Sequence, residues 1–125
     1  MKNIPVLILV VFGIAISSMA SAYEDYTMDI AASDISAFYI HTSHHPNESI
    51  GYIATLHMSA GVVGLPSTTG VCDSGFWIDS ATNSAAYSMI LAAVASQNDL
   101  NIHYSTQPTP WNNTHYCAII RVGIN

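Results

Sequence analysis

Aromatic and amide side chains gather near the end of the sequence, where their types suit the recognition of a sugar. Tyr104, Trp111 and Tyr116 flank a segment that also contains Asn112 and Asn113. A flat aromatic ring can stack on the C–H face of a sugar, while amides and hydroxyls bind the sugar hydroxyl groups. We therefore predict a ligand-binding patch formed by these five residues.

A structural interpretation of the same segment stands beside the functional one. Large aromatic side chains also close the end of a small β fold. In that interpretation Trp111 packs over the fold and binds nothing. Trp77 is expected to be a core residue in either case.

The six histidines of the chain suggest a different chemistry. His41, His44 and His45 lie close together in sequence, and neutral imidazole binds zinc, copper and nickel. A turn that brings His41 beside one of its neighbours would form part of a divalent-metal site. No His-Glu-x-x-His or Cys-x-x-Cys pattern accompanies them, so the other interpretation is solvated polar residues. Imidazoles also gain a proton below about pH 6.5, which raises a hypothesis of acid sensing.

Catalysis and nucleic-acid binding find little support in the sequence. A Gly-x-Ser-x-Gly nucleophile motif and a phosphate-binding glycine loop are both missing. We therefore expect a protein without enzymatic activity and without a cofactor. Residues 23–125 carry eight acidic residues and one base, Arg121, a formal charge of −7. Nucleic acids and anionic lipid surfaces bind clustered Lys and Arg, so neither is an expected partner.

The first 22 residues have the pattern of a signal peptide. Lys2 precedes an apolar run from Ile4 to Ile16, and Ala20-Ser21-Ala22 matches the small-x-small cleavage signal. The mature chain is then expected to begin at Tyr23 and to form one domain over residues 23–125. The apolar run is short for a membrane span, and no second run of about 18 residues follows it. We expect a secreted or periplasmic product.

Hydrophobic periodicity predicts five strands and one helix. The expected strands cover residues 35–42, 50–58, 71–78, 100–104 and 116–124, after an irregular acidic lead-in over residues 23–33. Between the third and fourth strands the apolar residues change to helical spacing, with Ala86, Ile90 and Ala93 on one face. We expect a helix from Ser84 to Ser96, ended by a left-handed residue at Asn98.

The order of three strands, one helix and two strands is that of the OB-fold, a five-stranded Greek-key barrel. In such a barrel the third and fifth strands are neighbours, which would bring Cys72 and Cys117 together. An oxidising compartment favours one disulfide between them, with two free thiols or an intermolecular bridge as alternatives. We expect a mainly β barrel of this kind. The structural alternative is an α+β sheet with one covering helix.

Several short segments carry a resemblance to a known family. They are Cys72 followed by Trp77-Ile78-Asp79, Ala86–Ala93, Leu100–Tyr104, and Cys117 ahead of Ile119-Ile120-Arg121-Val122. This half of the mature chain resembles the B subunits of pertussis-like and subtilase-type AB5 toxins, which are small exported bacterial proteins. The resemblance implies an OB-fold, a homo-oligomer that is a pentamer, a glycan or cell-surface receptor, and a catalytic toxin-like subunit as partner. It implies no individual binding residue.

The resulting prediction is an exported, non-enzymatic binding module that associates with itself and recognises a glycan or another cell-surface molecule. One alternative is a periplasmic protein that binds a divalent metal through His41, His44 and His45. Another is a structural or inhibitory partner of a second secreted protein.

Overall fold

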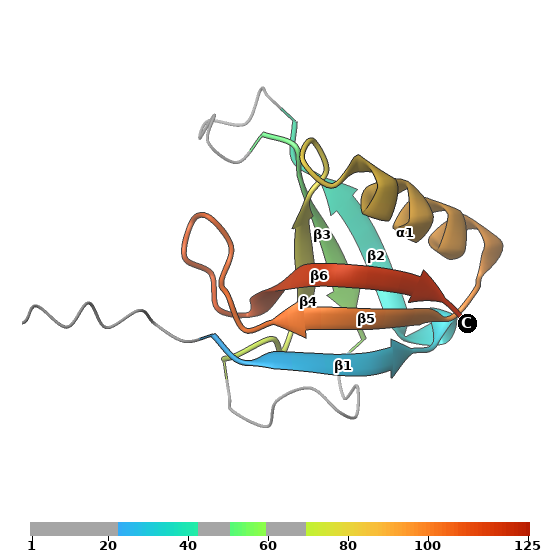
Figure 1. Cartoon of the computed structure of the whole chain (residues 1–125), viewed down its shortest axis with the longest axis horizontal. Helices are drawn as coiled ribbons and strands as arrows, with labels where there is room; N and C mark the ends of the chain where they lie inside the picture. Colours follow the sequence, from blue (N-terminus) through green and yellow to red (C-terminus); the bar gives the residue numbers. More distant parts are fainter. Residues whose placement is uncertain (1–22, 43–50, 60–69) are drawn as a thin grey trace, which may run out of the picture.

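The structure is a computed structural model, and it describes residues 23–42, 51–59 and 70–125. The expected signal segment over residues 1–22 lies outside these residues. The described part is mainly β with one long helix (Figure 1). Its elements are β1 (Asp25–Ile30), the 3-10 helix η1 (Ala32–Asp34), β2 (Ile35–Ile40), β3 (Ile53–Met58), β4 (Gly75–Asp79), α1 (Ser84–Ser96), β5 (Leu100–Ser105) and β6 (Tyr116–Ile124).

The strands form one mixed sheet of six, in the order β1-β5-β6-β4-β3-β2. The β4–β6 pair is parallel and the other pairs are antiparallel. Figure 1 shows β1, β5 and β6 side by side, with β2, β3 and β4 crossing them steeply. Because β1 and β2 are the outer strands, the sheet does not close on itself. The expected closed cylinder of five strands is therefore wrong, and the described sheet is open.

The additional strand is β1, in the segment that the sequence presents as an irregular acidic lead-in. β1 pairs with β5 along its whole length, from Asp25 opposite Ser105 to Ile30 opposite Leu100. Only Ile30 of this strand is fully buried, and most of its other side chains face solvent. Tyr26, Met28 and Ile30 nevertheless alternate with polar residues, and Met28 and Ile30 pack against the core. An apolar period of two is therefore present in this strand, and the acidic residues between its members obscure it.

The predicted neighbourhood of the third and fifth strands is confirmed. β4 lies beside β6, and a disulfide joins Cys72 to Cys117 with their Cα atoms 5.1 Å apart. The strand predicted over residues 71–78 begins only at Gly75, so Cys72 lies before the strand and is not its first part. Cys72 has a left-handed φ of 56°, and extended pairing therefore cannot include it.

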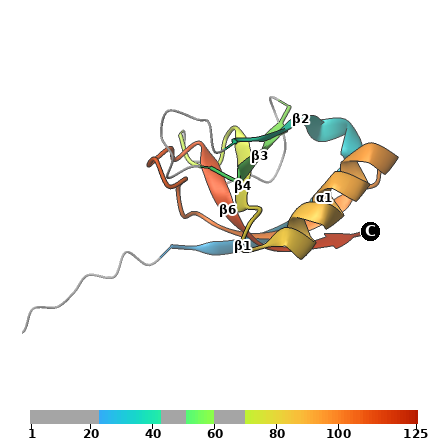
Figure 2. The same ribbon diagram turned by 90° about the horizontal axis from the view of Figure 1, so that it is seen from above.

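The core lies between the sheet and α1. Ile90 and Ala93 are the fully buried residues of the helix, and α1 packs against β6 and β4 (Figure 2). The largest buried side chains of the sheet include Phe76, Leu56 and Ile102. The predicted helix bounds of Ser84 and Ser96 are confirmed, but the left-handed residue that ends the helix is Gln97 instead of Asn98.

Within residues 23–42, 51–59 and 70–125, no helix has the length and apolar character needed to cross a membrane.

Candidate functional site

A hollow of about 290 Å³ opens on the sheet face that points away from the core. It is lined by six side chains, and we call it the aromatic hollow. Its lining residues are Tyr39, His41, Thr55, His57, Trp111 and Tyr116. None of the six is a carboxylate, a lysine or an arginine, so the hollow presents aromatic faces and neutral polar groups.

Strand register brings these side chains together. Tyr39 of β2 lies opposite Thr55 of β3, and both point to the same face. His57 of β3 and Tyr116 of β6 are each opposite the same residue of β4, Gly75. Because Gly75 has no side chain, the rings of His57 and Tyr116 approach across it, with centroids 5.1 Å apart.

His57 joins the polar groups of the hollow into one network. Its Nε2 lies 3.1 Å from the Thr55 hydroxyl, and its Nδ1 lies 3.2 Å from the Tyr116 hydroxyl. A neutral imidazole satisfies both contacts, since one nitrogen donates and the other accepts. Burial and the neighbouring His41 lower the pKa of His57. Burial likewise raises the pKa of Tyr116, so both groups stay neutral at neutral pH.

The remaining rings complete the wall. Tyr39 meets His57 edge-on at a centroid distance of 4.9 Å. Trp111 is half-buried and meets His41 edge-on at 5.3 Å. Edge-to-face contacts of this kind hold aromatic rings in fixed orientations.

The loop between β5 and β6 positions Trp111. Thr109 is 2% exposed, and its hydroxyl accepts a hydrogen bond from the Asn113 backbone N–H at 2.9 Å. The Asn113 side chain in turn accepts the His115 backbone N–H at 3.0 Å. Asn112 is exposed with a left-handed φ of 63°. These contacts shape the turn around Trp111, and neither asparagine lines the aromatic hollow.

The five sequence-predicted patch residues therefore lie in three places. Trp111 and Tyr116 line the hollow together, and Asn112 and Asn113 belong to the adjoining turn. Tyr104 is 0% exposed, stacks on Tyr26 and meets Phe76 edge-on, so it has no surface with which to contact a ligand.

Trp77 is also placed differently from its prediction. It was expected in the core, but it is only partly buried, on the face opposite the core cluster. Its indole N–H donates to the Gln107 carbonyl at 3.1 Å, which fixes the ring over the sheet. The prediction of a core tryptophan is wrong because β4 alternates, and Phe76 and Ile78 take the core face.

The predicted metal cluster falls partly outside the described residues. His41 lines the aromatic hollow, whereas His44 and His45 lie outside the described residues. In the described part of the chain, no three His, Cys, Asp or Glu side chains gather where a metal ion could be held. His115 instead pairs with Asp73 at 2.5 Å on the surface, and that contact lowers the pKa of the Asp73 carboxyl.

Tyr39, Thr55 and His57 are the lining residues that sequence reasoning missed. Thr55 and His57 share one face of an alternating strand, which was the available signal. Their proximity to Tyr116 depends on the parallel β4–β6 pair, which alternation alone does not specify. Searches of the chain against protein-family models, curated proteins and solved structures found no match.

Proposed function

We propose that the mature chain is an exported, non-enzymatic binding module that recognises a cell-surface glycan in the aromatic hollow. The observation that carries this proposal is the gathering of Tyr39, Trp111 and Tyr116 around one uncharged depression of about 290 Å³. That volume is close to the lower end for ligand sites, which suits one sugar ring. Aromatic faces stack on sugar C–H groups, and the His57 network supplies fixed polar atoms beside them.

A binding role accounts for the lining better than catalysis does. The hydroxyls of Thr55 and Tyr116 are both engaged by His57, and the lining contains no carboxylate that could orient the imidazole as a base. Nucleophilic catalysis by a hydroxyl needs a neighbouring base and a third group that orients that base.

We also propose that the chain is related to the B subunits of AB5 toxins. The parallel β4–β6 pair supports an OB-like strand order, and η1 links the two outer strands so that β1 and β2 resemble halves of one bent strand. Export through the segment over residues 1–22, self-association and a catalytic toxin-like partner follow from the same proposal.

Substitution of Trp111 tests the site. We expect Trp111→Ala to weaken binding of an array-identified glycan about tenfold or more, because one stacking partner is lost. Asn112→Gly is the control, since this exposed neighbour lies outside the hollow and glycine accepts its left-handed φ of 63°. Glycan-array binding followed by calorimetric titration measures both. Equal affinities in the two variants would contradict this site, and an array without any bound glycan would contradict the function.

A further inference from the structure

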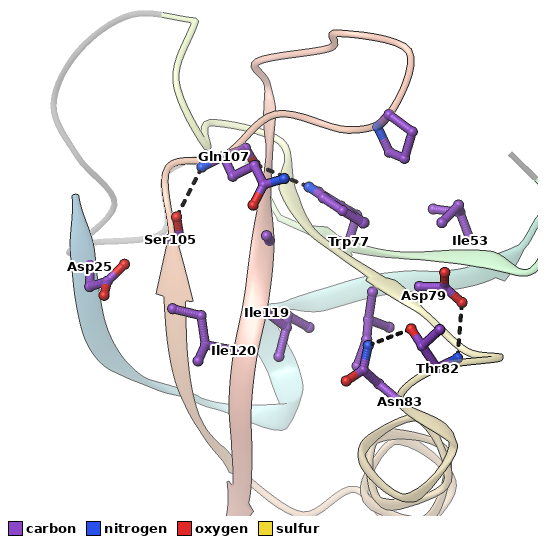
Figure 3. Close-up of a pocket in the computed structure, with 13 residues that line it drawn as sticks. Asp25, Ile53, Trp77, Asp79, Thr82, Asn83, Ser105, Gln107, Ile119 and Ile120 are labelled. Carbon is purple, nitrogen blue, oxygen red and sulfur yellow. Dashed lines mark hydrogen bonds between the residues drawn. The ribbon is translucent and has the colours of Figure 1, made fainter. Parts of the chain in front are cut away.

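A second depression, of about 510 Å³, is lined by Trp77 and Ala118, which share the face of the aromatic hollow, and also by Ile78 and Ile119 of the core cluster. We call it the polar groove, and Figure 3 shows its side chains around β4, β5 and β6. Trp77, Ile119 and Ile120 supply apolar surface, while Asp25, Gln107 and others supply carboxylates, amides and hydroxyls. A half-buried indole beside hydrogen-bonding groups is the mixture that sugars require.

The two depressions belong to one row of residues that crosses the whole sheet. Each strand contributes one residue, and every neighbouring pair is in register. From β1 to β2 the row is Asp25, Ser105, Ala118, Trp77, Thr55 and Tyr39. The first four line the polar groove and the last two line the aromatic hollow. Residues in register point to the same face, so the two depressions adjoin along this row, and we call the pair the trough.

The loop between β5 and β6 also contributes neighbouring residues to the two depressions. Pro110 lines the polar groove, and the next residue, Trp111, lines the aromatic hollow. At about 4.8 Å per strand spacing, five steps across the sheet give a path of roughly 24 Å along its curved surface. This is longer than a single sugar ring needs.

We propose that the polar groove and the aromatic hollow are subsites of one binding site for an uncharged oligosaccharide of two or more sugar units. This inference rests on the proposed glycan recognition and adds the length and charge of the ligand. The indole of Trp77, held by the Gln107 carbonyl, is the second stacking platform. Gln107 is itself fixed, because its backbone N–H donates to the Ser105 hydroxyl at 3.3 Å (Figure 3).

Charge selects against acidic sugars. The groove holds two carboxylates, Asp25 and Asp79, and neither depression is lined by a lysine or an arginine. Arg121, the single base of residues 23–125, is opposite His103 and lines neither depression. A sialylated or sulfated chain would place its anion beside these carboxylates, whereas the hydroxyls of a neutral chain can donate to them.

The test compares ligand length and ligand charge on the full mature protein. The probes are the strongest neutral oligosaccharide from a glycan array, its mono- and disaccharide fragments, and its sialylated form. We expect the oligosaccharide to bind about tenfold or more tightly than the monosaccharide, and the sialylated form to bind less tightly than the neutral one. Trp77→Ala should remove the advantage of the oligosaccharide over the monosaccharide.

Two further variants keep the test decisive if Trp77→Ala fails to fold. Asp25→Asn removes an exposed carboxylate of the groove and should narrow the preference for neutral over sialylated ligand. Asp34→Asn makes the same charge change on η1, outside both depressions, and should leave that preference unchanged.

The possible failures are distinguishable. No glycan binding by the unsubstituted protein would overturn the proposed function and this inference together. Trp111-dependent binding that is equally tight for the monosaccharide and the oligosaccharide would overturn the inference alone. Tighter binding of the sialylated form would also overturn it, because the groove would then accept an anion.

Discussion

His57 holds the aromatic hollow together through two hydroxyl contacts, and its charge state therefore affects both the site and the fold. Thr55 and Tyr116 occupy its two ring nitrogens. A protonated ring would have to donate at both nitrogens, so the hydroxyl arrangement would have to change. Burial and the nearby His41 oppose protonation, and the other ionisable rings that face His57 are those of Tyr39 and Tyr116.

This environment predicts a loss of stability in mild acid. The pKa of His57 is lowered in the folded state, so the unfolded chain takes up this proton first. The stabilisation is therefore complete above the ordinary imidazole pKa of about 6.5 and is lost as pH falls below it toward the lowered value. We expect the free energy of unfolding to fall between about pH 7 and pH 5, and His57→Gln to flatten that decline. Urea denaturation across this range measures both. Equal slopes in the two proteins would contradict the role of His57.

At the scale of elements, the close approach of β3 and β4 depends on Gly75. Its φ of 144° lies in the region that side chains disfavour, and an added Cβ would overlap the carbonyl oxygen of Leu56. That oxygen is part of the β3 backbone, so it cannot move without disturbing the strand pair. Gly75 also separates His57 from Tyr116, and the hollow therefore requires a glycine here.

Gly75→Ala should consequently lower the free energy of unfolding by roughly 3 kcal/mol or more, through overlap and backbone strain. Gly123→Ala is the matched control on β6. Its new Cβ would lie 3.9 Å from the Asn101 Cβ, an ordinary contact, and its expected effect is within about 0.5 kcal/mol. Urea denaturation measures both variants. A Gly75→Ala midpoint equal to that of Gly123→Ala would refute the packing argument.

The contrast between α1 and β1 explains how much of the fold the sequence predicts. The bounds of α1 are predicted correctly because Ile90 and Ala93 repeat at helical spacing and are both buried. β1 is missed although Met28 and Ile30 alternate with Asp25, Thr27 and Asp29, because three acidic residues in eight positions make the segment resemble a solvated lead-in. The short apolar alternation of an edge strand is a weak signal, because only one of its faces packs against the core.

The candidate site is predictable to a similar extent. Trp111 and Tyr116 are recognisable by type, and both line the hollow. Tyr104 shares an alternating face with Leu100 and Ile102, all of them fully buried, so alternation already points it toward the core. His57 reaches the hollow through pairing of distant strands. Residue type therefore identifies candidates, and strand register decides which of them meet.

For the whole molecule, the junction between the two groups of strands matters most. β4 and β6 share only three register pairs, from Gly75 with Tyr116 to Trp77 with Ala118. The Cys72–Cys117 disulfide lies at this short parallel pair of strands. Trp77 and Ala118, the last register pair of β4 and β6, belong to the row of residues that lines the trough. The disulfide thus links the two groups of strands at the strand pair with the fewest register positions. The proposed ligand crosses the sheet at the same place.

The charge of residues 23–125 bears on the proposed self-association. Residues 23–125 carry a formal charge of −7, so two copies repel one another at low ionic strength. Apolar side chains also remain exposed, including Ile40 at 44%, Leu91 at 43% and Ile124 at 46%. Burial of such surface between copies would favour association. The balance between these two effects is adjustable by salt, because screening weakens only the repulsion.

Association should therefore increase with ionic strength. Between about 20 mM and about 500 mM NaCl the screening length falls from roughly 20 Å to roughly 4 Å. We expect the mass measured by light scattering to rise over this range toward a multiple of the protomer mass. Arg121→Gln removes the single base of residues 23–125 and should move the transition to higher salt. A protomer mass at every salt concentration would rule out self-association, because apolar contacts that form only against charge repulsion must strengthen once that repulsion is screened.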